Sequence, residues 1–402
     1  FIHNGSKLLK DNFKFCCCCC ISSIFVGNAT PVILAVPKEK KARENRVALT
    51  PEVVKELVGK GFSVLVERGA GERSYLADSL YEAAGARMGD SQAVFSEADV
   101  VLAVNAPTSD DIARMKKGAV LISFLFAATA PETVSALESA GISAFSMDAV
   151  PRISRAQKMD ALSSQSNLAG YKTVLMAANA LGKIFPMLMT AAGTVKPAKV
   201  VIMGAGVAGL QAIATAKRLG AIVEVSDIRP ETKEQVQSLG GYFIELKGDD
   251  SMKTEGGYVK EVSEDFLRKQ QELVGKHVAE ADIVITTALI PGKKAPRLIT
   301  EAMVKSMKAG SVIVDMAVEQ GGNCEISELN QTVVKHGVTL IGESNLPSLL
   351  PLNASQLYAK NISTFLYHLA DKDAFRWEME EEITKGSLIV HQGKAVHPSV
   401  AK

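Results

Sequence analysis

The chain has 402 residues, 47% of them hydrophobic and 22% charged, which is the composition of a globular protein with length for two or three domains. Its 45 Lys and Arg residues nearly balance its 44 Asp and Glu residues, and a net charge of +1 argues against a nucleic-acid-binding protein. Five of the six cysteines form one run at 16–20 and the sixth is Cys324, a spacing that predicts neither a disulfide framework nor a metal site.

The first thirty residues differ from the rest in composition. The chain begins with Phe1, and residues 15–37 carry no charge. The mainly apolar part covers only 15–26, which is shorter than the roughly 20 residues that a membrane-spanning helix needs. We therefore predict that residues 1–30 are a linker or a targeting-like extension.

The next segment of the chain alternates between strand and helix patterns. Thr50 is an N-cap residue, and Pro51 follows it at the first position of a helix. A second helix is predicted at 131–139. Strands are predicted at 31–36, 62–67, 99–104, 118–126 and 142–147. Strands that alternate with helices favour a parallel sheet covered on both faces.

The second half repeats this alternation after a long helix, at about 160–181. Strands are predicted at 200–203, 222–226, 283–287, 311–315 and 338–341. A helix at 355–369 is expected to return the chain to the first domain, where 389–396 adds an edge hairpin. We predict an α/β protein with two doubly wound, Rossmann-like domains and a cleft between them. The first domain comprises 31–160 and 353–402, and the second comprises 161–352.

A glycine pattern joins a predicted strand to a predicted helix in the second domain. Gly204, Gly206 and Gly209 form G-x-G-x-x-G, in which the first glycine permits a tight turn, the second lets a pyrophosphate approach the backbone, and the third allows close helix packing. The start of the following helix offers free N–H groups to phosphates. The pattern predicts a dinucleotide site, and the alternative is a purely structural glycine turn.

The acid that follows the glycines indicates which dinucleotide is bound. Asp227 ends the next strand, about 20 residues on, where such an acid accepts hydrogen bonds from the ribose hydroxyls. Glu224 is expected to face away. Asp227 would repel a 2′-phosphate, which favours NAD(H) over NADP(H). Arg229 could accept that phosphate, but we favour a solvated arginine or a contact on the adenine side.

Two further motifs carry a family resemblance. Residues 43–51 (RENRVALTP), followed by the glycine pattern, resemble the alanine dehydrogenase/transhydrogenase family. Residues 151–170 (PRISRAQKMDALSSQSNLAG) are similar to the NAD(H)-binding component, domain I of the alpha-subunit type, of proton-translocating NAD(P)+ transhydrogenases, and 189–194 (MTAAGT) support this. The resemblance covers about residues 31–400.

This resemblance implies a dimeric, soluble component at an inner mitochondrial or bacterial-type membrane, facing the matrix or cytoplasm. It would bind NAD(H) in the interdomain cleft and exchange hydride with NADP(H) held by a separate component, coupled to proton translocation by a transmembrane component. The residues implied around the nicotinamide are Arg152, Gln157, Asp160 and Ser163. The resemblance also implies a mobile loop that closes on the nucleotide through Tyr258, and the polar stretch 248–264 independently reads as such a loop.

The polar residues of this loop suit direct hydride transfer. Transfer between two nicotinamides requires alignment and exclusion of water but no general acid or base, so an amide, a hydroxyl and one Arg–Asp pair suffice. The structural alternatives are an ion pair between Arg152 and Asp160, and capping of the long helix by Gln157 and Ser163.

The main rival is an amino-acid dehydrogenase of the same family, which needs acid–base groups because amine oxidation also moves a proton. The resemblance places Arg46 at its carboxylate-binding arginine. However, its substrate lysine falls at 104–107, its histidine at or beside Phe126, and its late acid at Glu319. No histidine occurs from residue 4 to 276, so the acid–base machinery is absent. A third possibility is a nucleotide-binding module without chemistry of its own.

Overall fold

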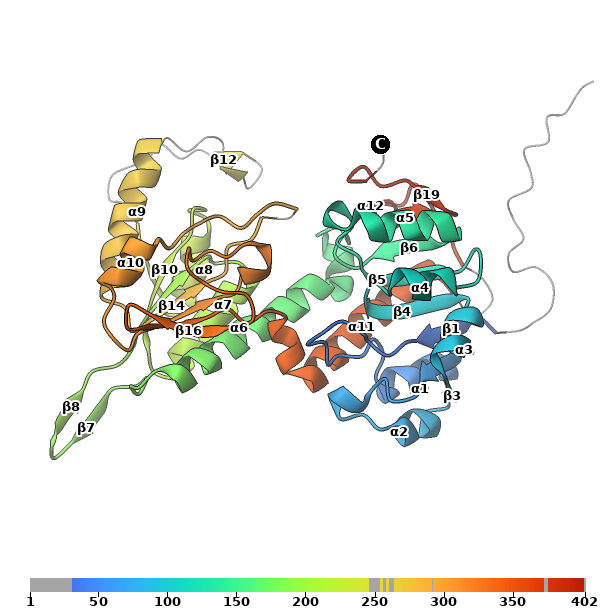
Figure 1. The fold of residues 1–402 in the computed structure, drawn as a ribbon, viewed down its shortest axis with the longest axis horizontal. Helices are drawn as coiled ribbons and strands as arrows, with labels where there is room; N and C mark the ends of the chain where they lie inside the picture. Colours follow the sequence, from blue (N-terminus) through green and yellow to red (C-terminus); the bar gives the residue numbers. More distant parts are fainter. Residues whose placement is uncertain are drawn as a thin grey trace, which may run out of the picture.

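The computed structural model describes residues 31–245, 254–255, 258–259, 264–290, 292–371 and 375–400. They form two lobes, each built on one sheet, and two long helices run between the lobes: α6 (Ala161–Ala180) and α11 (Pro351–Leu369) (Figure 1). The predicted extension at 1–30 lies outside the described residues. Along the described ranges of the chain, no helix is long and apolar enough to cross a membrane.

The first lobe contains an eight-stranded sheet in the order β19-β18-β6-β5-β4-β1-β2-β3. The strands are β1 (Ile33–Val36), β2 (Ser63–Glu67), β3 (Arg87–Gly89), β4 (Val100–Asn105), β5 (Val120–Phe124), β6 (Ser143–Ser146), β18 (Leu388–His391) and β19 (Lys394–Ala395). Strands β1 to β6 are parallel, whereas β18 pairs antiparallel with both β6 and β19.

Helices cover both faces of this sheet because its central strands are apolar on both sides. Every residue of β5 is buried, as is every residue of β4 before Asn105. One apolar core includes residues of α1 and α11, and a second includes residues of α3, α4 and α5. The helices are α1 (Pro51–Gly59), α2 (Asp78–Ala83), α3 (Ser91–Ser96), α4 (Ser109–Ala113), α5 (Pro131–Ala140) and α12 (Glu382–Ser387).

The second lobe contains a seven-stranded sheet in the order β11-β10-β9-β14-β15-β17-β16. Its strands are β9 (Lys199–Met203), β10 (Ile222–Ser226), β11 (Tyr242–Phe243), β14 (Ile283–Thr286), β15 (Val312–Asp315), β16 (Thr332–Lys335) and β17 (Val338–Ile341). Its helices are α7 (Val207–Arg218), α8 (Thr232–Ser238), α9 (Glu264–Ala279) and α10 (Glu301–Ser306). The strands are parallel except β16, which is antiparallel to β17.

The fold class is therefore confirmed as α/β with two Rossmann-like sheets. One expectation needs correction, because both sheets have antiparallel edges and are mixed rather than fully parallel. The first sheet contains strands from both ends of the described chain, and on this topology we propose the domain division expected from the sequence.

Strand order places a crevice in the second lobe. The chain runs from β9 to β10 on one side and later adds β14 on the other side of β9. Ligands of open α/β sheets bind at such a reversal, outside the carboxyl ends of the strands. Helix α6 packs along α7, so closely that a Cβ on Gly170 would lie 2.1 Å from the carbonyl oxygen of Ala208.

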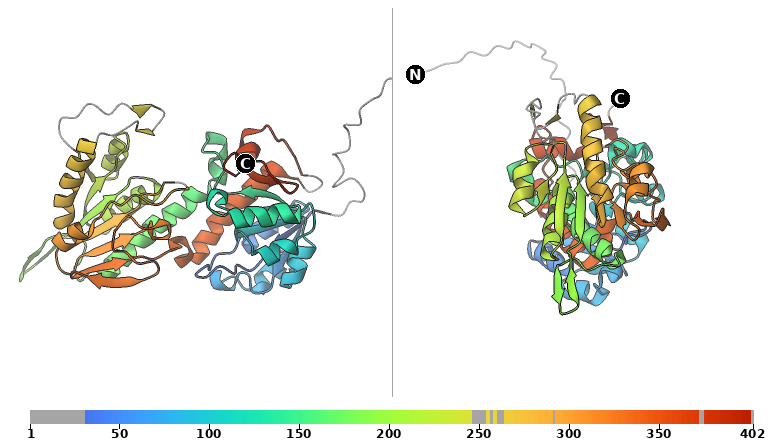
Figure 2. Two further views of the ribbon diagram at one scale, coloured as in Figure 1. Left: turned by 45° about the horizontal axis from the view of Figure 1, so that its top comes forward. Right: turned by 90° about the vertical axis from the view of Figure 1, so that its left-hand side faces the viewer.

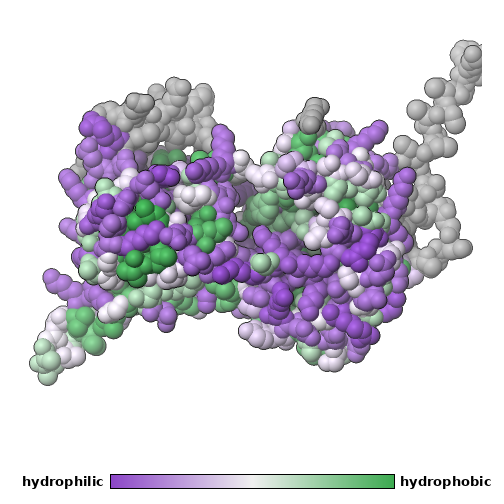
Figure 3. Space-filling view, in the orientation of Figure 1, coloured by the Kyte–Doolittle hydropathy of each residue, from purple (hydrophilic) through white to green (hydrophobic). Residues whose placement is uncertain are grey.

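A hairpin that the sequence analysis did not predict projects from the second lobe. It consists of β7 (Leu188–Thr190) and β8 (Gly193–Val195), all of whose residues are exposed. Figure 2 shows that the hairpin extends away from the lobe in both further views. Met187 and Met189 are 60% and 73% exposed, and Figure 3 shows the apolar surface at the hairpin and a hollow between the two lobes.

Candidate functional site

Three glycines shape the turn between β9 and α7, each for a different reason. Gly204 has φ +107°, a conformation that favours glycine, and a Cβ there would lie 2.4 Å from Oγ1 of Thr287. A Cβ on Gly209 would lie 1.9 Å from the carbonyl oxygen of Gly204. Gly206 has open space within 4 Å of the corresponding position. Folding thus requires the outer two glycines, and the space beside Gly206 is left free.

Thr287 supports this turn, although the sequence analysis assigned it no role. Its Oγ1 donates to the carbonyl oxygens of Met203 at 3.3 Å and Gly204 at 3.1 Å. Thr287 directly follows β14, the neighbour of β9. A hydroxyl residue at the carboxyl end of the adjacent strand was the available signal, because both strand ends meet at the crevice.

Asp227 lies directly after β10 and ties the glycine turn to the next loop. Its Oδ2 accepts from the backbone N–H of Ala205 at 2.6 Å, and its Oδ1 accepts from the backbone N–H of Arg229 at 2.8 Å. The carboxylate also pairs with the Arg229 guanidinium at 3.0 Å. The charge of Arg229 is thus balanced within the chain, an arrangement that the sequence analysis did not predict.

The electrostatics of this pair are local. The hydrogen bond to Asp227 raises the pKa of Arg229, outweighing partial burial. Glu224 lies elsewhere, since its carboxylate contacts Nζ of Lys199 at 3.0 Å and Nδ1 of His277 at 2.7 Å. Asp227 is therefore the acid of this strand that faces the glycine turn.

The predicted nicotinamide loop lies between β6 and α6 and contains a 3₁₀ helix, η3 (Ser154–Met159). Arg152, Gln157 and Asp160 line one cavity of about 240 Å³. Ser163 is not among its lining residues. The structure thus brings three of the four predicted residues together.

Asp160 and Ser163 form the N-terminal cap of α6. Oδ1 of Asp160 accepts from the backbone N–H of Ser163 at 2.8 Å, and Oδ2 accepts from its Oγ at 2.6 Å. The alternative ion pair between Arg152 and Asp160 is not formed. Within the described stretches of the chain, the side chains of Arg152 and Gln157 have no hydrogen-bond or ion-pair partner, so their polar ends are available to a ligand.

Tyr258 cannot be placed in the site. Its backbone belongs to the short strand β13 (Tyr258–Val259), which pairs with β12 (Thr254–Glu255). Its side chain and most of the predicted loop at 248–264 lie outside the described residues. The role of Tyr258 remains a prediction.

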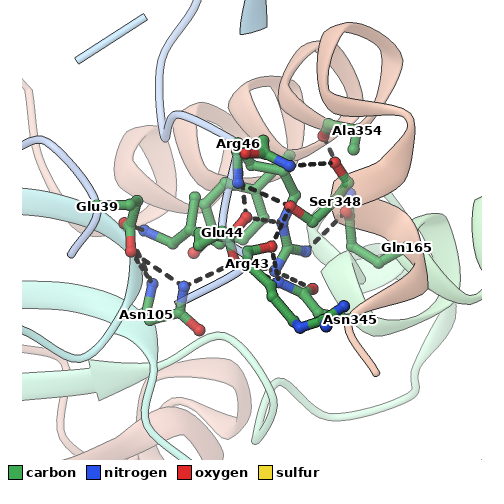
Figure 4. A network of polar contacts seen from close by, with 12 residues as sticks. Glu39, Arg43, Glu44, Arg46, Asn105, Gln165, Asn345, Ser348 and Ala354 are labelled. Atoms are coloured by element: carbon green, nitrogen blue, oxygen red, sulfur yellow. Dashed lines mark hydrogen bonds and ion pairs between the residues drawn. The ribbon is translucent and has the colours of Figure 1, made fainter. Parts of the chain in front are cut away.

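A buried polar network connects the first lobe with α6 and with the segment before α11 (Figure 4). Arg46 pairs with Glu44 through Nε–Oε1 at 2.8 Å and Nη2–Oε2 at 2.7 Å. The same guanidinium donates to Gln165 Oε1 at 2.9 Å and Asn345 Oδ1 at 3.1 Å. Nδ2 of Asn105 donates to Glu44 at 2.9 Å. The Arg46 charge is therefore consumed inside the protein.

Two carboxyl groups of the network titrate in opposite directions. Burial raises the pKa of Glu39 to about 7, against hydrogen bonds from Asn105 and Val104. Burial would also raise the pKa of Glu44, but the hydrogen bonds and charge of Arg46 outweigh it and lower that pKa to about 2. Glu44 is thus the anion that partners Arg46.

The positions that an amino-acid dehydrogenase would use are engaged differently. Asn105, at the expected lysine, donates to Glu39 as well as to Glu44. Phe126, at the expected histidine, is half-exposed and stacks on Phe124 with ring centroids 5.7 Å apart. Glu319 is exposed in a 3₁₀ turn. These side chains supply neither a free cation for a carboxylate nor a base beside it.

Comparisons with known proteins agree with this geometry. The family model "Alanine dehydrogenase/PNT, N-terminal domain" matches residues 35–169, and the corresponding C-terminal domain model matches 173–398. An NAD(P) transhydrogenase alpha subunit from Rhodospirillum rubrum is 52% identical over 378 residues, which cover 91% of this chain and 98% of that protein.

Two further relatives place the chain between the branches of this family. The crystal structure of transhydrogenase from Sinorhizobium meliloti is similar with a TM-score of 0.83 and 47% identity, covering 90% of this chain and 100% of that chain. Alanine dehydrogenase from Bacillus subtilis is 33% identical over 92% of this chain and 94% of that protein. With both domain models matched in order and close relatives matched along nearly their whole length, the chain belongs to the alanine dehydrogenase/PNT family.

Proposed function

We propose that this chain is the NAD(H)-binding component of a proton-translocating transhydrogenase. In this proposal, the pyrophosphate of NAD(H) lies on the turn at Gly206 and the nicotinamide lies in the cavity beside Arg152 and Gln157. The observation that carries the proposal is the pair of unpartnered side chains in that cavity. The higher identity to a transhydrogenase alpha subunit, 52% against 33% for an alanine dehydrogenase, supports the choice of branch.

The two halves of the proposed site are arranged along one helix. Asp160 caps the start of α6, and Gly170 contacts the start of α7 directly after the glycine turn. Ten helical residues separate these points, which corresponds to about 15 Å. A dinucleotide held by its pyrophosphate at the turn would extend its nicotinamide half along α6 towards Arg152.

The residues of this cavity suit hydride transfer without acid–base chemistry. NAD(H) supplies the hydride donor or acceptor when it is bound. Gln157 can hydrogen-bond the carboxamide through both its donor and its acceptor, and Arg152 offers only donors. Their contribution is to orient the ring, and NADP(H) on a separate component would face it.

The partners in this proposal are that NADP(H)-binding component, a transmembrane component and a second copy of this chain. The similar Rhodospirillum protein is named as one portion of an alpha subunit, which implies further subunits in that protein. The exposed apolar hairpin β7–β8 supports the homodimer, because Met187, Leu188 and Met189 gain little within one copy. We place the assembly at a mitochondrial inner or bacterial-type membrane.

The test is a reconstitution with the full chain. It is mixed with an NADP(H)-loaded transhydrogenase component and an NAD+ analogue, and reduction of the analogue is followed. A parallel reaction contains the chain, NAD+ and alanine alone. Reduction that depends on the NADP(H) component is expected. Turnover with alanine alone would assign the chain to the dehydrogenase branch.

The variant Gln157→Asn tests the alignment role within the same assay. Shortening the side chain by one methylene should misplace the ring, so we expect single-turnover hydride transfer to slow by about tenfold or more. Equilibrium NADH binding should change little. Equal losses in binding and transfer would show that Gln157 acts in affinity rather than alignment.

A further inference from the structure

The loop that carries Arg152 and Gln157 is fixed from its opposite side. Within η3, Ala156 and Met159 are buried in the core of the first lobe, three residues apart, as the three-residue period of a 3₁₀ helix requires. Gln157 and Lys158 between them are exposed. One face of the loop therefore packs against the lobe while Gln157 stays on the open face.

Asn361 of α11 holds the backbone of this loop. Its Nδ2 donates to the carbonyl oxygen of Lys158 at 2.9 Å, and its Oδ1 accepts from Oγ of Ser164 at 2.7 Å. Asn361 is only 9% exposed, so these bonds form where water competes little. One amide thus joins the residue after Gln157 to the first turn of α6.

A second contact comes from α12, which packs on the start of the loop. A Cβ on Gly386 would lie 2.5 Å from Cγ and 3.1 Å from Cδ of Pro151, the residue before Arg152. A proline ring cannot turn away as a flexible side chain would, since its φ is fixed. Any side chain at position 386 must therefore displace Pro151 or α12.

Ion pairs add to this contact. Glu381, the N-cap of α12, accepts from the backbone N–H of Thr384 at 2.8 Å and lies 2.9 Å from Nε2 of His368. Its Oε1 pairs with Arg155 of the loop at 2.7 Å. The Arg155 side chain is about half exposed, so we assign this pair less weight than Asn361 and Gly386.

We infer that Asn361 and Gly386 are positioning residues for the nicotinamide loop, and that the segment following the NAD(H)-binding domain sets the alignment of Arg152 and Gln157. This inference rests on the proposed function. Neither residue lines the cavity, so neither contacts the nucleotide. Their substitution should change the rate of hydride transfer more than NADH affinity, because the glycine turn lies in the other lobe.

The experiment compares Asn361→Ala and Gly386→Ala with two matched controls in the full chain. Asn353→Ala changes an exposed asparagine of the same helix that bonds only Gln356 among the described residues. Gly59→Ala adds a methyl group at the end of α1, where nothing lies within 4 Å. Alanine favours helix over glycine, so a loss in Gly386→Ala must be steric.

Trp377, the single tryptophan of the chain, reports on folding of this region. Its ring lies 4.6 Å from that of Phe375 and 4.7 Å from that of His391. An emission spectrum like that of the unmodified chain shows that a variant keeps this packing. NADH binding is measured by equilibrium titration, and single-turnover hydride transfer is measured with the NADP(H)-loaded component. Conservative Asn361→Gln is included as a rescue attempt.

We expect Asn361→Ala and Gly386→Ala to slow hydride transfer by about tenfold to a hundredfold, as sub-ångström to ångström misplacement does. NADH affinity and Trp377 emission should stay near those of the controls, and Asn361→Gln should recover part of the rate. If Gln157→Asn slows transfer but both variants match their controls, the positioning role is wrong. Parallel loss of affinity and rate would also overturn it. If Gln157→Asn itself has no effect, the proposed nicotinamide site fails instead.

Discussion

The carboxylate of Asp227 accepts four hydrogen bonds, one from Ala205 and three from Arg229. A carboxylate has about four lone-pair sites, so ribose hydroxyls must compete with the Arg229 side chain for them. Binding of NADH is therefore expected to move Arg229 aside. The same displacement leaves no acceptor for Arg229 unless the nucleotide supplies one.

Asp227→Ala should weaken NADH binding by about 1–3 kcal/mol, because the ribose loses its acceptor. It also frees the Arg229 charge, so the affinity for NADPH relative to NADH should rise. Titrations with both nucleotides measure the ratio. Glu224→Ala is the matched control on the same strand, and an unchanged ratio in Asp227→Ala would remove Asp227 from cofactor selection.

Glu39 makes stability depend on pH. Its pKa is about 7 in the folded protein against 4.5 for the free group, so the folded state keeps a proton that the unfolded chain loses. Stability should therefore fall as pH rises from about 4.5 to 7, by up to about 3 kcal/mol from this group. Glu39→Gln stays neutral and should remove this loss. Its Tm relative to the unmodified chain should be higher at pH 8 than at pH 5, and an equal difference at both would contradict the assignment.

At the scale of elements, the turn from β9 to α7 separates folding from binding. Gly206→Ala places a methyl group in open space, so we expect the melting temperature to stay while NADH affinity falls, because the pyrophosphate can no longer approach the backbone. Gly209→Ala places a Cβ 1.9 Å from the oxygen of Gly204 and should lower both. Calorimetry and NADH titration distinguish the two, and unchanged binding in Gly206→Ala would exclude the turn as the phosphate site.

Apolar runs predicted most elements because central strands of a sheet covered on both faces are hydrophobic throughout. The strands β10 and β17 have the predicted bounds, and α6 and α11 were also expected. Two strands escaped for physical reasons: β3 has three residues and no buried one, and β16 alternates exposed and half-buried residues as an edge strand does. The hairpin β7–β8 buries no residue, so it leaves no apolar pattern.

The candidate site was predictable only where it is local in sequence. The glycine turn and the loop at 152–163 are continuous segments with their own residue patterns. The network around Arg46 joins residues up to 301 positions apart, and contacts of that kind leave no spacing to read. Asn361 is likewise joined to Lys158 across 203 positions.

For the whole molecule, the exposed hairpin leads to a prediction on assembly. Met189→Asp should shift the dimer towards monomers, because a charge is costly to bury between two copies. Sedimentation at several concentrations measures the change. Val334→Asp is the control, since Val334 is 69% exposed on β16 away from the hairpin. A dimer unaffected by Met189→Asp would place the contact elsewhere.

The first sheet has a consequence for the order of events during protein synthesis. Strands β1 to β6 leave the ribosome early, but β18 and β19, which complete their sheet, are made after the whole second lobe. The second lobe can therefore fold while the first is still unfinished, since domains generally fold as units during synthesis. A nascent chain would acquire the glycine turn before Asn361 and Gly386 exist. Nucleotide binding would thus precede competence for hydride transfer, and a truncated product could capture NAD(H) without passing its hydride on.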